Sequence, residues 1–147
     1  MAPVTISIEI DAPPETVWAE LERLEDHVEW MADAESMTFT TDQTRGVGTV
    51  AEVATVIGPL RTTDVMRFVE WEDGRSMSVR HEGLVSGTGT FVLDAIGGNR
   101  TRVTWREELD FPIHFGGPIG ETVATPVFRR IWRGNLERLK ARVEAAN

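Results

Sequence analysis

Few side chains in this 147-residue chain could do chemistry, and two of them fall in strand-like runs in its second half. His81 shares one strand face with the apolar Met77 and Val79, and Glu107 shares a face with Trp105 in a later run. An imidazole with its ordinary pKa near 6.5 can bind a polar group or move a proton at neutral pH. We therefore expect both side chains to point inward, where His81 could act on a ligand.

Arg67 is the third candidate, and the alternation of apolar residues around it is consistent with two orientations of its side chain. Val65 and Val69 would put Arg67 on the inward face, whereas Met66 and Phe68 would put it on the outward face. A buried carboxylate needs a partner, which an inward Arg67 or the histidine could supply. With the histidine and the glutamate, Arg67 completes the only set that could transfer protons to a substrate.

Each candidate also has a plainer interpretation. His81 could be a strand residue hydrogen-bonded to a neighbour, and Glu107 could lie near a strand end in contact with water. His27 and His114 are expected at the surface, in loop or helix-edge positions. The sequence leaves these alternatives open.

Several kinds of chemistry are excluded by residues that the chain lacks. Cys is absent, which removes disulfides, thiolate catalysis and Cys-ligated zinc. Tyr is also absent, so a mechanism that uses a phenol is excluded. No nucleophile elbow accompanies a Ser-His-Asp order, and no His–carboxylate spacing suggests a metal. We therefore expect neither a metal nor a cofactor.

The elements that must position these residues begin with a strand and two short helices. Apolar and polar residues alternate over 4–10, which predicts a half-buried strand. Pro13-Pro14 then ends the strand and begins a short helix with an apolar side. A second short helix is expected over residues 25–31.

Strand-like runs joined by short turns fill the middle of the chain. Asp73-Gly74 and Gly97-Gly98-Asn99 are hairpin signals, and consecutive short connections imply an antiparallel meander. With the first strand, the count is six or seven. The runs after the short helices are residues 37–41, 49–57, 60–71, 75–82, 85–96 and 100–111.

Residues 118–147 predict one long amphipathic helix, because apolar residues recur at spacings of three and four. Val123, Val127 and Ile131 are expected to face the sheet, and Pro126 should kink the helix. A long helix laid across a curved sheet leaves a space in which a small apolar molecule could bind.

The length and the charge of the chain limit the class of protein to which it can belong. The chain suits a single domain, residues 1–147, and its 15 basic and 24 acidic residues give a formal net charge of −9. That charge argues against nucleic acid and anionic lipid surfaces as partners. No segment approaches the roughly 20 apolar residues of a membrane span, and no signal peptide is evident. We expect a soluble cytoplasmic protein without stable membrane insertion, whose oligomeric state, a homodimer included, stays open.

Three segments carry a resemblance to a known family. They are Ile8-Glu-Ile-Asp-Ala-Pro-Pro-Glu-Thr-Val-Trp18 with Trp30 a dozen residues later, Gly98-Asn-Arg-Thr-Arg-Val-Thr-Trp105, and Asn135-Leu-Glu-Arg-Leu-Lys140. In order and spacing the chain resembles the START/Bet v 1-like (SRPBCC) superfamily, in particular its polyketide cyclase/dehydrase and lipid-transport group. The resemblance implies an α+β helix-grip fold: a curved antiparallel sheet of six or seven strands around a long C-terminal helix, with two short helices after the first strand. It also implies a hydrophobic cavity.

Strand parity and helix faces then nominate residues for the cavity wall. Gly87 and Gly89 should thin the wall between the later strands, which could enlarge the cavity or mark a bulge. The candidate ligand-binding residues are Trp30, Phe39, Met77, Val79, His81, Phe91, Trp105, Phe115, Val123, Val127 and Ile131.

Three functions compete at this point. The first is binding of a hydrophobic or aromatic small molecule, lipid- or polyketide-like, without chemistry. The second is a polyketide cyclase, aromatase or dehydratase in which His81, Glu107 and Arg67 transfer protons in a dry cavity. The third is a co-chaperone-like protein-interaction module, which would require an exposed apolar patch on the outer face of the sheet.

Overall fold

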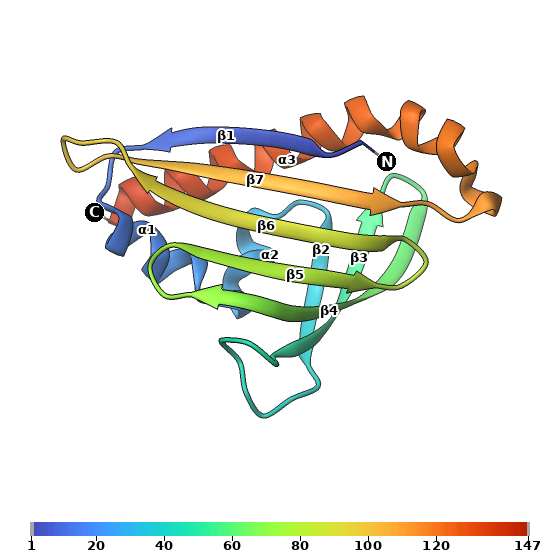
Figure 1. The fold of residues 1–147 in the computed structure, drawn as a ribbon, viewed down its shortest axis with the longest axis horizontal. Helices are drawn as coiled ribbons and strands as arrows, with labels where there is room; N and C mark the ends of the chain where they lie inside the picture. The colour runs from blue at the N-terminus through green and yellow to red at the C-terminus, as the bar shows by residue number, and fades with distance from the viewer. Residues whose placement is uncertain (1, 147) are drawn as a thin grey trace.

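A computed structural model describes residues 2–146 as one sheet gripping one long helix (Figure 1). The chain begins with strand β1 (Val4–Ile10), helix α1 (Pro14–Leu21), the 3-10 helix η1 (Leu24–Asp26) and the single turn α2 (His27–Trp30). Six more strands follow: β2 (Ala34–Phe39), β3 (Val50–Ile57), β4 (Leu60–Glu72), β5 (Ser76–Glu82), β6 (Ser86–Ala95) and β7 (Thr101–Asp110). The 3-10 helix η2 (Ile113–Phe115) leads into α3 (Gly117–Ala146).

All seven strands form one antiparallel sheet in the order β1-β7-β6-β5-β4-β3-β2. Strands β2 to β7 form a meander, whereas β1 pairs with the last strand and so joins the two ends of the chain. Figure 1 shows β2 and β3 running steeply across the direction of β5, β6 and β7. The sheet is therefore strongly twisted and concave, and α3 packs along β1 on the concave side. The expected helix-grip architecture is confirmed.

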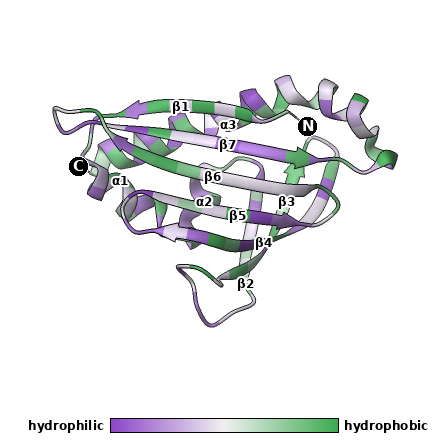
Figure 2. Ribbon diagram, in the orientation of Figure 1, coloured by the Kyte–Doolittle hydropathy of each residue, from purple (hydrophilic) through white to green (hydrophobic). Residues whose placement is uncertain are grey.

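The fold corrects some expected boundaries. The second short helix is split into η1 and α2, and β2 begins at Ala34, three residues earlier than the sequence pattern indicated. Hydrophobic and hydrophilic residues interleave along the strands (Figure 2). One break in this alternation lies in β4, where a bulge between Phe68 and Glu70 shifts the pairing with β5. The extra residue of this bulge, Val69, explains why alternation alone assigns two different inward faces to β4.

An aromatic cluster forms the centre of the core at one end of the grip. Trp132 of α3 stacks on Phe128 at 5.0 Å between ring centroids and meets Trp105 of β7 at 5.6 Å. Trp105 in turn contacts Phe91 of β6 at 4.8 Å, and both lie against Trp30 of α2. These five rings tie the helix, the sheet and α2 together and form a solid end to the space inside.

Pro126 lies within α3 and has no N–H to donate to the carbonyl of Thr122. The hydroxyls of Thr122 and Thr125 also bond back to the carbonyls of Pro118 and Glu121, a pattern that bends helices. The helix indeed bends in its first half (Figure 1). Among residues 2–146, no helix is long and apolar enough to cross a membrane.

Candidate ligand cavity

A cavity of about 610 Å³ lies between the concave face of the sheet and the first half of α3. Its wall is mainly apolar and comes from β2 to β7, from η2 and α3, and from residues around α2. Large apolar side chains that reach solvent frame its mouth, from the start of β4, the β5–β6 connection and α3. They are Leu60, Leu84, Ile119, Val123 and Val127. A volume of this size suits a small organic molecule.

Eight of the eleven residues nominated from sequence border this cavity. They are Met77, Val79, His81, Phe91, Trp105, Phe115, Val123 and Val127. The sheet and α3 thus bring together residues from β5, β6, β7, η2 and α3. Whether they hold a ligand remains a prediction.

Three nominated residues lie elsewhere. Trp30 is completely buried behind Phe91 and Trp105, so it supports the wall instead of forming it. Phe39 and Ile131 are partly buried and pack against the core, outside the cavity lining. The error arose because aromatic and aliphatic residues on an inward face can contact either the core or the cavity.

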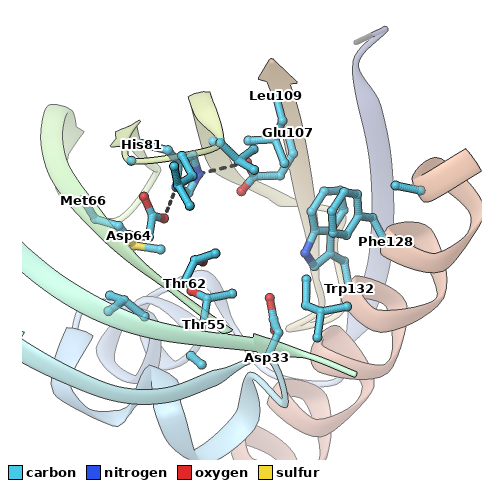
Figure 3. Close-up of a pocket in the computed structure, with 18 of the residues that line it drawn as sticks. Asp33, Thr55, Thr62, Asp64, Met66, His81, Glu107, Leu109, Phe128 and Trp132 are labelled. Atoms are coloured by element: carbon cyan, nitrogen blue, oxygen red, sulfur yellow. Dashed lines mark hydrogen bonds and ion pairs between the residues drawn. The ribbon is translucent and has the colours of Figure 1, made fainter. Parts of the chain in front are cut away.

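One buried polar cluster interrupts the apolar wall, formed by Asp64, His81 and Glu107 (Figure 3). His81 Nδ1 lies 2.7 Å from Asp64 Oδ2, and His81 Nε2 lies 3.0 Å from Glu107 Oε2. The second Glu107 oxygen, Oε1, accepts a hydrogen bond of 2.9 Å from Trp105 Nε1. We call these three residues the carboxylate–imidazole triad. The histidine thus lies between two carboxylates.

A glycine of β6, Gly89, allows the triad to form. His81 is on β5 and Glu107 is on β7, with β6 between them, and the register places Gly87 opposite His81 and Gly89 opposite Glu107. A Cβ atom on Gly89 would lie 2.3 Å from Glu107 Oε1. The absence of a side chain there lets the carboxylate lie across β6 and reach the histidine, which is the physical reason for glycine in the middle of a strand.

The triad sets the charge of His81. Burial alone would lower the pKa of its imidazole, but the charge of Glu107 and the hydrogen bonds and charge of Asp64 outweigh burial and raise the pKa to about 10. His81 is therefore an imidazolium at neutral pH, and both of its N–H groups donate to carboxylates. It has no free lone pair with which to act as a base in this arrangement.

Arg67 does not join the triad, which corrects its place in the expected catalytic set. Met66 and Phe68 point into the cavity, so Arg67 lies on the outer face of β4. There its Nε forms an ion pair of 2.7 Å with Glu82 Oε1, and both side chains are more than two-fifths exposed. Within the triad, the neutralising cation is His81.

Comparison with known proteins identifies the family to which this architecture belongs. The family described as polyketide cyclase / dehydrase and lipid transport matches residues 1–144. The chain belongs to this family. No curated protein matches the chain, but many solved structures do. A protein of Thermus thermophilus is similar with 25% identity and a TM-score of 0.81 over 99% of both chains.

Two more distant structures share the fold. The Zhui aromatase/cyclase of a Streptomyces species has 14% identity and a TM-score of 0.77, over 97% of this chain and 93% of that one. A START superfamily protein of Mycobacterium smegmatis has 12% identity and a TM-score of 0.82 over 99% of both chains. This chain thus has the complete helix-grip fold of the polyketide cyclase / dehydrase and lipid transport family.

In this family member the cavity also contains polar residues that sequence reasoning missed. Asp64 is the most important, and the alternation Asp64, Met66, Phe68 would have placed it inward had the bulge in β4 been known. Asp33 points into the cavity from the segment before β2, opposite the triad (Figure 3). Thr55 and Thr62, paired across β3 and β4, lie between them.

His27 was expected at the surface, and this expectation is wrong. Its side chain is buried beside Trp30, and its Nε2 donates a 2.7 Å hydrogen bond to the carbonyl of Leu21. Burial lowers the pKa of His27 despite that hydrogen bond and nearby acidic residues, so the ring is neutral at pH 7. His114 is exposed, as expected.

Asn135 lies in the third segment that carries the family resemblance, and it has a structural role. It is fully buried, its Nδ2 donates 2.8 Å to Asp33 Oδ1, and its Oδ1 accepts 3.0 Å from the amide of Ala32. It therefore ties α3 to the segment that leads into β2. Among residues 2–146, no group of three or more His, Asp or Glu side chains is arranged to hold a metal ion.

Proposed function

We propose that this protein binds a hydrophobic small molecule, lipid- or polyketide-like, in the cavity between the sheet and α3. The observation that carries the proposal is the cavity of about 610 Å³ with a mainly apolar wall. Removing apolar surface from water yields about 25 cal/mol per Å², so an apolar guest that fills this space gains affinity from both partners.

The exposed apolar residues support binding over a protein-interaction role. The co-chaperone-like alternative requires an apolar patch on the outer face of the sheet. Five of the seven large apolar side chains that are exposed among the described residues instead line the cavity and frame its mouth. The two others, Val47 and Ile113, lie in the β2–β3 connection and in η2. This distribution is what a route for an apolar guest requires.

A cyclase, aromatase or dehydratase activity is the second candidate, favoured by the buried triad. In that case His81 would act as a fixed cation and hydrogen-bond donor toward Asp64 and Glu107, not as the base, because both ring nitrogens are already bonded. A carboxylate of the triad would have to accept the substrate proton, within a cavity that excludes water.

Binding can be tested with the neutral probe N-phenyl-1-naphthylamine, whose emission rises in an apolar site. Energy transfer from the five tryptophans, of which Trp105 and Trp132 border the cavity, reports that the probe is bound to the protein. We expect saturable binding, weakened about tenfold by Val79→Phe, which fills the cavity. The control Val47→Phe adds the same ring at an exposed position outside the cavity and should leave the affinity unchanged. Failure of the wild-type protein to bind neutral apolar probes, or equal binding by both variants, would refute the proposal.

A further inference from the structure

The charged groups around the cavity are unevenly distributed. In the described part of the chain, three carboxylates line it, those of Asp33, Asp64 and Glu107, and no arginine or lysine does. The two histidines of the lining are His27 and His81. An anionic guest would therefore depend on these histidines for a positive partner.

Neither histidine has an N–H group free for an anion. His81 donates from both ring nitrogens, to Asp64 and to Glu107. His27 is neutral and donates its Nε2–H to the carbonyl of Leu21. An anion that approached His81 would meet two carboxylates around one imidazolium, which is a net repulsive charge.

The remaining polar groups favour a guest that donates hydrogen bonds. Asp33 accepts one hydrogen bond on Oδ1, from Asn135, and its carboxylate points into the cavity (Figure 3). Thr55 and Thr62 add hydroxyl groups on the wall between Asp33 and the triad, and because a hydroxyl can donate or accept, the carboxylate of Asp33 makes the difference between guests. A hydroxyl or amine of a guest can bond these oxygens, whereas a guest carboxylate would lose its water without gaining a cationic partner.

We propose that the cavity selects neutral or cationic apolar molecules that carry a hydrogen-bond donor, and rejects molecules that carry a carboxylate, sulfonate or phosphate. This inference rests on the proposed binding function and specifies its ligand class. It excludes fatty acids and intact anionic phospholipids as guests. An alkyl alcohol, an alkyl amine or a neutral phenolic polyketide fits.

The decisive comparison uses two probes with one scaffold. N-phenyl-1-naphthylamine is neutral, and 8-anilino-1-naphthalenesulfonate adds a single sulfonate to the same rings. We expect the neutral probe to bind at least about tenfold more tightly. The order should repeat when dodecylamine, dodecanol and dodecanoate compete with the neutral probe, with dodecanoate the weakest.

Two variants locate the source of the selectivity. Asp33→Asn removes one cavity charge while its carbonyl can still accept from Asn135, so the preference for the neutral probe should shrink about threefold or more. Glu35→Gln removes the same charge from an exposed side chain outside the cavity and should leave the preference unchanged. An equal effect of both variants would assign the selectivity to the overall charge of −9 and overturn the inference.

The polarised N-terminus of α3 is the competing site for an anion, because Gly116 and Gly120 border the cavity there. Sulfonate or dodecanoate binding as tight as that of the neutral compounds would show that this end of the helix prevails, and would overturn the inference while leaving the binding function intact. If no neutral probe binds at all, the binding function itself is wrong.

Discussion

The two halves of α3 meet the sheet in different ways. From Phe128 onward the helix places its apolar face in the core, where Leu136 and Leu139 are almost completely inaccessible to solvent. Before Phe128 the same helical spacing leaves Ile119 77% exposed and Val123 71% exposed, at the mouth of the cavity. One amphipathic pattern thus forms a packed core at one end and the rim of a cavity at the other.

The sheet opposite each half differs in the same way. Opposite the packed half, the rings of Phe91 and Trp105 fill the space, and Trp105 contacts Trp132 of α3. Opposite the open half, the carboxylate–imidazole triad links β4, β5 and β7 through hydrogen bonds and charge. The comparison shows that packing stabilises one end, whereas buried electrostatic contacts hold the wall at the end that contains the cavity.

The largest effect is expected when the cation of the hollow end is removed. His81→Ala leaves two buried carboxylates without their shared partner, and we expect the free energy of unfolding to fall by about 3–5 kcal/mol at pH 7. Chemical denaturation measures this change. The control His114→Ala, at an exposed position, should change stability by less than about 0.5 kcal/mol. Equal losses would mean that the triad contributes nothing specific.

The pH dependence of stability should separate the two ends through their histidines. The folded pKa of His81 is raised to about 10, so its contribution is complete below pH 6.5 and is lost as the pH rises toward 10. We expect a loss of about 1 kcal/mol per pH unit between pH 7 and 9, absent in His81→Gln. Few other side chains change charge there, because the chain has no Tyr or Cys.

His27, beside the packed end, should give the opposite slope. Its folded pKa lies below the ordinary value, so the unfolded chain binds more protons and stability falls as the pH drops below 6.5. Thermal denaturation of the wild type and of His27→Gln from pH 5 to 9 tests both slopes. They are the loss of stability above pH 7 caused by His81 and the loss below pH 6.5 caused by His27. A wild-type profile that is flat above pH 7 would contradict the charge assigned to His81.

An effect smaller than that of His81→Ala is expected from a matched pair of truncations in the two halves of α3. Val143→Ala removes two methyl groups from a side chain that is 2% exposed, at a cost of about 2 kcal/mol. Val123→Ala makes the same change at a 71% exposed position and should cost less than about 0.5 kcal/mol, while weakening the binding of the neutral probe. Similar losses of stability in both variants would mean that the first half of α3 is part of the core.

Most of the architecture could be predicted from the sequence, because hydrophobic periodicity reports which face of an element avoids water. The strand of Val4–Ile10, the hairpins at Asp73-Gly74 and Gly97-Gly98-Asn99, and the long final helix all follow from such local patterns. The cavity could be predicted only in part. Periodicity marks a side chain as inward, but it does not distinguish Trp30, which packs behind the wall, from Trp105, which forms it.

The polar part of the cavity depended on details that the sequence does not reveal. The bulge at Val69 hid the inward face of β4, so Arg67 was considered and Asp64 was missed. The meeting of His81 with Glu107 across β6 depends on tertiary register. Gly87 and Gly89 predict a thin wall, and in the structure Gly89 makes room for the carboxylate of Glu107.

Pro126 stands at the junction between the packed and the open parts of α3, and it leaves the Thr122 carbonyl without its usual donor. The segment on its N-terminal side can therefore loosen without breaking a complete ladder of backbone bonds. Under the proposed binding function, a guest would then need only a local excursion of about three helical turns to enter or leave, without global unfolding. How long a molecule stays inside and how stable the protein is would then be separate quantities, each open to selection without changing the other.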